Sequence, residues 1–140
     1  MLSAVEAQIR QMDLSEHVYL VGMLNNIAPL LGRADAVVLP STVEPLGMAQ
    51  IEALALRVPV VASDVDGIPE TIEHGVTGWL VQPGNILAWQ NALAEILDNP
   101  EQAHQRACAG RLAVTSRFAV HRNIEQILSL IEQAQNGRRS

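Results

Sequence analysis

The stretch Ala36–Asp64, AVVLPSTVEPLGMAQIEALALRVPVVASD, decides the fold of this 140-residue chain. It begins with the apolar run AVVLP and ends with the apolar run VPVVAS, and a Pro/Gly loop and an apolar segment of helical length lie between them. Continuous apolar runs are typical of strands that are buried on both faces of a parallel sheet. The stretch therefore predicts a strand–helix–strand unit whose helix begins at about Gly47.

Strands and helices are predicted to alternate on both sides of this unit. The expected elements are a helix to Met12, a strand in HVYLVG (17–22), a short helix in NIAPLLGRAD beginning near Asn25 or Asn26, a short helix in GIPETIEHG (67–75), a strand in GWLVQPG (78–84), a helix capped by Asn85, a helix from Pro100 to about Ala113, and a last helix in VHRNIEQILSLIEQAQ (120–135). The pattern predicts one α/β unit over residues 1–140, a Rossmann-like parallel sheet of about four strands flanked by helices.

Composition excludes several classes of protein. A net charge of −6 and 3% aromatic residues argue against a nucleic-acid partner. The single cysteine, Cys108, rules out an internal disulfide and fits a reducing compartment. No apolar run approaches the roughly 20 residues that span a bilayer, and the N-terminus lacks the pattern of a signal peptide. We expect a cytoplasmic protein and leave peripheral membrane association open.

Metal binding is not expected. The four histidines are too scattered along the chain for a metal site. Asp64 and Asp66, in SDVDG, fit a turn with polar caps better than a pair of metal ligands.

Two acids bracket the start of the helix expected at Gly47. Glu44 lies in the preceding loop, and Glu52 follows Met48 by one helical turn. The Gly47 and Met48 N–H groups are expected to be free at the helix start, where phosphate is favoured. Glu52 could accept two hydrogen bonds from a vicinal diol, as acidic residues do with ribose. The pattern therefore suits a nucleotide diphosphate.

Simpler roles for the two acids are also open. Glu44 could only stabilise the helix N-terminus, which is worth about 0.3–1 kcal/mol. Glu52 could be the solvent-facing residue of an otherwise buried helix.

Residues 34–85 carry a series of short motifs in a fixed order. The motifs are Pro40-Ser41, Glu44 to Gly47, Glu52, Pro59 to Ala62, Gly67 to Glu70, and Gly75 to Gly78. In this order they resemble the C-terminal domain of the family 4 (group 1) glycosyltransferases, which have the GT-B fold of two facing Rossmann-like domains. No one of these motifs is specific, but their order over some fifty residues is.

The resemblance implies a role for each matching residue. Glu52 would bind the ribose hydroxyls of a nucleotide-sugar donor, and Glu44, the candidate catalytic residue, would lie near the donor sugar. The other implied donor-binding residues are Leu46, Gly47 and Met48, with backbone amides at the distal phosphate or sugar, and Gly22 and Met23 at the nucleobase. The family transfers sugars with retention of configuration and generally needs no tightly bound metal, so no cofactor is implied.

The chain also departs from the family pattern. The Arg and Lys that clamp the diphosphate have no match, and the chain contains no lysine. The resemblance thus implies a partial C-terminal domain that lacks the acceptor-binding N-terminal domain and is inactive alone. A non-catalytic nucleotide or sugar-phosphate binding module is one alternative. An inert fragment or interaction protein, with an exposed sheet edge that needs a partner or a second copy, is another.

Overall fold

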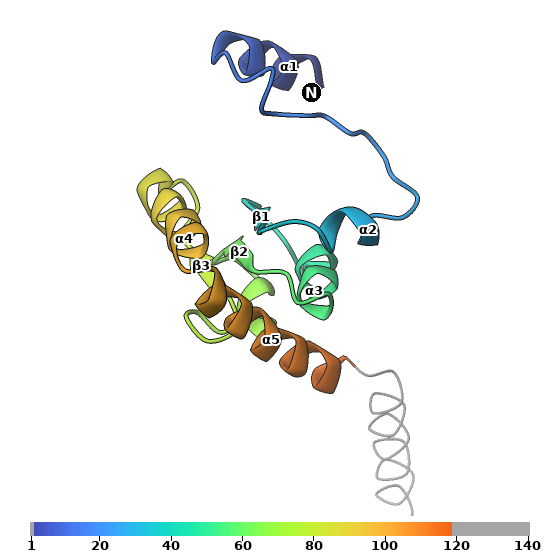
Figure 1. Cartoon of the computed structure of the whole chain (residues 1–140), viewed down its shortest axis with the longest axis vertical. Coiled ribbons are helices and arrows are strands. Elements are labelled where there is room, and N and C mark those ends of the chain that lie inside the picture. The colour runs from blue at the N-terminus through green and yellow to red at the C-terminus, as the bar shows by residue number, and fades with distance from the viewer. Residues whose placement is uncertain (1, 119–140) are drawn as a thin grey trace, which may run out of the picture.

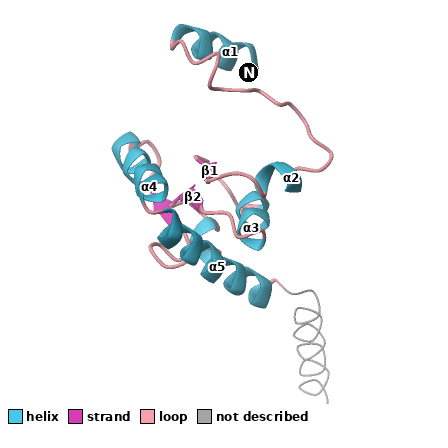
Figure 2. Ribbon diagram, viewed as in Figure 1, coloured by secondary structure: helices cyan, strands magenta, loops and turns pink. Residues whose placement is uncertain are grey.

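The computed structural model describes residues 2–118. Its elements are α1 (Leu2–Gln11), α2 (Ala28–Leu31), β1 (Val37–Leu39), α3 (Met48–Ala55), β2 (Val60–Ser63), the 3₁₀ turn η1 (Ile68–Glu70), β3 (Trp79–Val81), α4 (Ile86–Asp98) and α5 (Pro100–Arg117) (Figure 1). The three strands form one parallel sheet in the order β1-β2-β3 (Figure 2). The predicted α/β class and parallel sheet are confirmed.

Helices cover both faces of the central strand β2. Its residues alternate in direction, as the period of two in a strand requires. Val60 and Ala62 pack with Leu54 of α3 and Val114 of α5, whereas Val61 packs on the other face with residues of α4. All four residues of β2 are buried, so the prediction of a strand buried on both faces is confirmed there.

The apolar helix α3 packs directly on α5 at Gly110 and Val114, where α5 has small side chains that face Leu54. A Cβ added at Gly110 would lie 2.6 Å from Leu54 Cδ2 and 2.8 Å from the Thr77 carbonyl oxygen. Only glycine therefore allows this approach of α5 to α3 and to the loop before β3.

A polar cluster joins β3 to α4 and α5. The Trp79 indole N–H donates to Glu95 Oε2 at 3.0 Å, and Arg106 Nη1 lies 2.8 Å from Glu95 Oε1. The Arg106 guanidinium also stacks 4.5 Å from the centroid of the Trp79 ring. Both the indole and the carboxylate are therefore paired where three elements meet.

Several predicted elements differ from the structure. The predicted strand at 17–22 is an extended loop in which Tyr19 and Val21 are 74% and 57% exposed. A strand needs a neighbouring backbone to pair with, and β1 pairs only with β2. The described residues thus contain three strands rather than four.

The predicted helices agree with the structure to different degrees. α3 and α4 begin where expected, and Asn85 Oδ1 accepts from Ala88 N–H as a helix cap. The helix expected in GIPETIEHG is only the single turn η1. Ile72 N–H still donates to the Ile68 carbonyl, but Glu73 N–H donates to Thr77 Oγ1 instead of continuing the helix. α2 is likewise one turn, and α5 runs four residues further than predicted, to Arg117. The last predicted helix, 120–135, lies outside the described residues.

The N-terminal part of the chain lies apart from the layered body. α1 forms as predicted, but a long extended segment separates it from α2 and the sheet (Figure 1). Its apolar face stays open, with Val5 and Met12 40% and 60% exposed. β1 is correspondingly an edge strand: Val38 is 41% exposed, which corrects the prediction that β1 is buried on both faces. No helix within residues 2–118 combines the length and apolar character needed to cross a bilayer.

Candidate functional site

The candidate site lies where the parallel strands β1 and β2 end. The loop 40–47 leads from β1 into α3, and the loop 64–67 leads from β2 into η1. Two bonds join these loops: Glu44 N–H donates to Asp66 Oδ2 at 2.9 Å, and Gly67 N–H donates to the Glu44 carbonyl at 3.3 Å. In parallel α/β sheets, loops at this edge are where ligands bind.

Gly67 lets the two loops approach this closely. A Cβ at this position would lie 1.8 Å from the Pro45 carbonyl oxygen, which is inside any possible contact distance. Asp66 lies in the turn after β2, and its carboxylate accepts the Glu44 N–H of the other loop rather than an N–H of its own turn. Within residues 2–118, no three His, Cys, Asp or Glu side chains are grouped so that they could hold a metal ion.

The Glu44 side chain contacts the start of α3. Its Oε1 accepts a hydrogen bond from Gly47 N–H at 3.0 Å, so this amide is not free as expected. Gly47 itself has φ of 76°, a conformation that favours glycine. A ligand oxygen that binds the Gly47 amide must therefore displace the Glu44 carboxylate. The contact matches the simpler role considered for Glu44, and a role toward a donor sugar stays a prediction.

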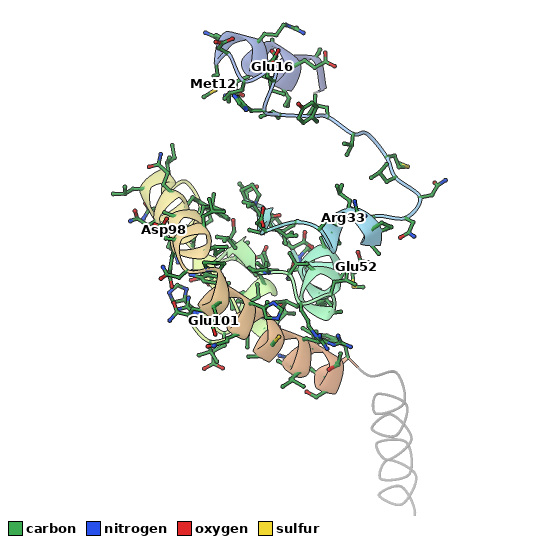
Figure 3. The ribbon with its side chains drawn as sticks, viewed as in Figure 1. Met12, Glu16, Arg33, Glu52, Asp98 and Glu101 are labelled. Atoms are coloured by element: carbon green, nitrogen blue, oxygen red, sulfur yellow. The ribbon has the colours of Figure 1, made fainter. Side chains whose placement is uncertain are left out.

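Glu52 lies on the exposed side of α3, toward α2 (Figure 3). Together with residues of the segment before α2 it lines a pocket of about 400 Å³. The other lining residues are Asn25, Asn26, Ile27, Ala28, Leu31, Ala55 and Leu56. The carboxylate is thus beside a partly apolar hollow rather than on a featureless helix surface.

The other predicted donor-binding residues are divided between two places. Leu46, Gly47 and Met48 lie together at the start of α3, one turn before Glu52. Gly22 and Met23 lie in the exposed extended segment: Met23 is 97% exposed, and no atom other than those of its chain neighbours lies within 4 Å of a Cβ built on Gly22. The structure therefore does not bring them to the pocket beside Glu52.

Comparison with known proteins identifies the family. The family model described as glycosyl transferases group 1 matches residues 2–113. The chain belongs to the group 1 glycosyltransferases.

Individual proteins of this family show the same relationship. The glycogen synthase of Mycobacterium tuberculosis is 40% identical over 100 residues, which are 70% of this chain and 24% of that protein. The crystal structure of Anabaena Alr3699/HepE in complex with UDP is similar with a TM-score of 0.89 and 28% identity, over 94% of this chain and 36% of that one. The C-terminal domain of a group 1 family protein, LpcC from Francisella tularensis, is similar with a TM-score of 0.73 and 25% identity, over 84% of this chain and 62% of that structure.

These matches confirm the predicted fold, a part of a GT-B glycosyltransferase with a Rossmann-like parallel sheet. The chain spans 24% of the glycogen synthase and 36% of the Alr3699/HepE chain. Motif order over residues 34–85 was therefore sufficient to recognise the group 1 family.

Residues other than those predicted also build the site of this group 1 chain. The sequence predicts Asn25 and Asn26 only as the start of a short helix, and in the structure both line the pocket beside Glu52. Gln50, completely buried on α3, donates to the Leu46 carbonyl in the loop before the helix, a contact that the sequence motifs do not predict. The signal in the sequence that points to Gln50 is a polar residue at a core position of an apolar helix.

Proposed function

We propose that this chain supplies the donor-nucleotide-binding part of a glycosyltransferase that transfers a sugar from a nucleotide-diphosphate sugar with retention of configuration. Residues 1–140 would form one partial C-terminal domain. The observation that carries the proposal is the position of Glu52, beside a pocket of about 400 Å³ and one turn from the start of α3. The complex of the similar Alr3699/HepE structure with UDP supports a diphosphate as the ligand.

We propose that each end of the site binds a different part of the donor. Glu52 would accept hydrogen bonds from the ribose diol, and the pocket wall with Asn25 and Asn26 would receive the nucleoside. Met48 lies four residues before Glu52, about 6 Å along the helix axis, a separation that suits a phosphate attached to that ribose. The diphosphate would then lie at the α3 N-terminus, where N–H groups and the helix dipole favour negative charge.

Glu44 would change partners when the donor binds. In the structure its carboxylate accepts a hydrogen bond from the Gly47 amide. A phosphate or sugar oxygen would take this amide and release Glu44 toward the donor sugar, the position proposed for a catalytic contact. Amides and a helix dipole directed at the diphosphate would stabilise charge on the leaving group, which is electrostatic catalysis.

The charges around the site favour a separate source of positive charge. Glu44, Asp64 and Asp66 are all acidic and lie in the two loops at this edge of the sheet. A diphosphate beside these carboxylates is repelled unless cations offset them. We therefore propose that another domain of the enzyme supplies basic groups and the acceptor site, and that the 140-residue chain binds donor nucleotide without transferring the sugar.

Calorimetry with UDP and GDP tests the binding role. Glu52→Ala removes a charged acceptor of two hydrogen bonds, so we expect about 10- to 100-fold weaker binding of the nucleotide that the wild type binds. Glu16→Ala is the matched control, because Glu16 is an exposed acid next to α1 and far from Glu52 (Figure 3). Equal affinity of the wild type and Glu52→Ala would exclude the proposed ribose contact.

A transfer assay with UDP-glucose and GDP-mannose tests the division of labour between domains. We expect no turnover by the purified chain, even where calorimetry detects nucleotide. Sustained transfer would contradict the need for a second domain. Tight nucleotide binding with neither turnover nor effect of an added N-terminal domain would favour a non-catalytic binding module instead.

A further inference from the structure

The backbone at the start of α3 packs against one buried polar side chain, that of Gln50. This residue is fully buried within the apolar helix, and its amide lies against Gly47. A Cβ built on Gly47 would lie 1.8 Å from Gln50 Oε1 and 2.1 Å from Gln50 Nε2. The glutamine amide thus fills the space directly beneath the backbone that begins the helix.

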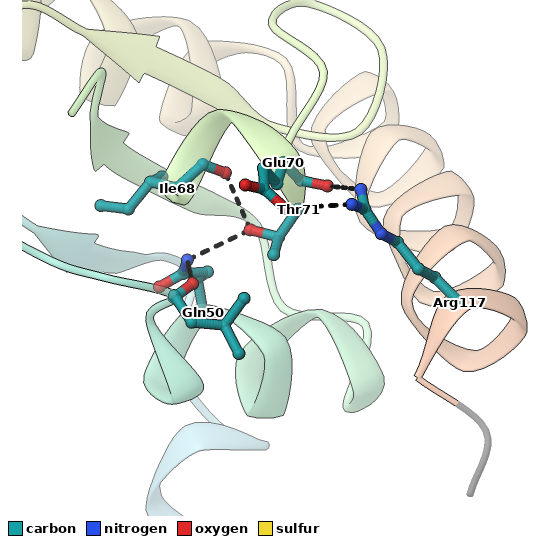
Figure 4. A network of polar contacts seen from close by, with 6 residues as sticks. Gln50, Ile68, Glu70, Thr71 and Arg117 are labelled. Carbon is teal, nitrogen blue, oxygen red and sulfur yellow. Dashed lines mark hydrogen bonds and ion pairs between the residues drawn. The ribbon is translucent and has the colours of Figure 1, made fainter. Parts of the chain in front are cut away.

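Hydrogen bonds from Gln50 join two loops of the site. Its Nε2 donates to the Leu46 carbonyl at 2.7 Å and to Thr71 Oγ1 at 3.1 Å, and Thr71 Oγ1 donates to the Ile68 carbonyl at 2.9 Å (Figure 4). Because the Thr71 hydroxyl gives its proton to the Ile68 carbonyl, its oxygen is free to accept, and within residues 2–118 it accepts from the amide nitrogen of Gln50. The chain of bonds therefore runs from the loop before α3 to the turn η1.

Packing alone does not explain a glutamine at this position. Among the described residues, Gln50 Oε1 is a buried side-chain oxygen with no hydrogen-bond partner. An unpaired buried oxygen opposes folding, and an apolar side chain of similar length would fill the same space without that cost. The two donated bonds are what the glutamine adds.

We propose that Gln50 is a positioning residue for the diphosphate end of the donor site. It holds Leu46 and Gly47 against η1, so that the amides at the start of α3 keep the geometry that phosphate oxygens require. It does not touch the nucleoside pocket at Glu52, whose lining residues exclude it. This role rests on the proposed donor-binding function and predicts an effect on phosphate contacts alone.

Two substitutions test the role by removing the bonds while preserving volume. Gln50→Met loses both donated bonds, and Thr71→Val loses the hydroxyl that links Gln50 to η1. NMR titrations with UDP and UMP separate the distal phosphate from the nucleoside. We expect about five- to tenfold weaker UDP binding by each variant, since one or two net hydrogen bonds are lost, with UMP affinity changed less than twofold.

Conservative variants distinguish positioning from general loss of structure. Thr71→Ser keeps the hydroxyl and should restore the ratio of UDP to UMP affinity, and Gln90→Met, at an exposed position of α4, should leave it unchanged. Where Gln50→Met does not fold, the pair Thr71→Val and Thr71→Ser provides the same comparison. A ratio that is the same in all variants, or a parallel loss of UDP and UMP binding, would overturn the positioning role.

Hydrogen exchange of the Gly47 amide provides a test that does not require a ligand. We expect faster exchange in Gln50→Met and Thr71→Val than in the wild type, Thr71→Ser and Gln90→Met. Equal rates in all five proteins would refute the role. If the wild type binds neither UDP nor UMP while the exchange rates differ as expected, the donor-binding function fails and the positioning of the loop by Gln50 stands.

Discussion

At residue scale, one residue is decisive at each end of α3: Arg57 at its C-terminus and Glu44 at its N-terminus. The helix ends in a Schellman motif: Val58 N–H donates to the Ala53 carbonyl and Arg57 N–H donates to the Leu54 carbonyl. The motif places Arg57 in the left-handed region, with φ of 62°, where glycine is the usual residue. At the other end, the Glu44 carboxylate binds the Gly47 amide and completes the start of the helix.

Arg57→Gly is expected to stabilise the chain. A non-glycine residue in this region costs of order 1–3 kcal/mol, and the greater freedom of glycine in the unfolded chain returns about 0.5–1 kcal/mol. We expect the free energy of unfolding to rise by about 0.5–1 kcal/mol in urea titrations. Arg57→Ala is the control, because it removes the guanidinium but keeps the Cβ; a gain as large as that of glycine would refute strain as the cause.

At the scale of elements, the contact of α3 with α5 depends on the absence of a side chain. Gly110 lies in the middle of the 18-residue helix α5, where glycine lowers intrinsic helix stability. The contact compensates for this, since the α5 backbone can approach Leu54 and the Thr77 carbonyl only without a Cβ. Close packing of the two helices holds α3, and therefore the candidate site at its start, against the body.

Gly110→Ala is expected to destabilise the protein, although alanine is the better helix former. Helix propensity would add about 1 kcal/mol of stability, but the overpacked contact costs typically 1–3 kcal/mol. We expect a net loss of about 1 kcal/mol in chemical denaturation. Gln105→Ala, at an exposed position of the same helix, should change stability by less than about 0.5 kcal/mol. A more stable Gly110→Ala protein would show that α5 has room to shift.

At the scale of the whole molecule, no described strand covers the outer side of β1 or that of β3, and the β1 edge carries an exposed apolar residue. β1 pairs with β2 on one side only, and Val38 is 41% exposed. The predicted strand 17–22 lies in the extended segment with apolar side chains exposed, including Tyr19 at 74%. Open strand edges and exposed apolar residues favour association with another chain or domain.

The isolated 140-residue chain is therefore expected to self-associate. Sedimentation velocity should show a concentration-dependent species larger than a monomer, and Val38→Lys should shift it toward monomer because a charged edge residue opposes strand pairing. Arg33→Lys, which preserves charge on the exposed end of α2, is the control. A monomer at all concentrations would contradict association through this edge.

The sequence by itself determined the parallel α/β class, the three paired strands, the helices from Met48 and Ile86, and the family. These features depend on apolar periodicity, caps and motif order, all of which are local in sequence. Only the tertiary structure decided that 17–22 is not a strand, that Glu44 binds the Gly47 amide, and that Asn25 and Asn26 lie beside Glu52.

The physical reason is the distance over which each interaction acts. A segment with a strand pattern forms a strand only where another strand can pair with its backbone. The role of a buried glutamine such as Gln50 depends on its acceptors, which include Thr71, 21 residues away in the chain. Local patterns predict the elements, whereas contacts between residues far apart in the chain decide which of them pair and which side chains meet at the site.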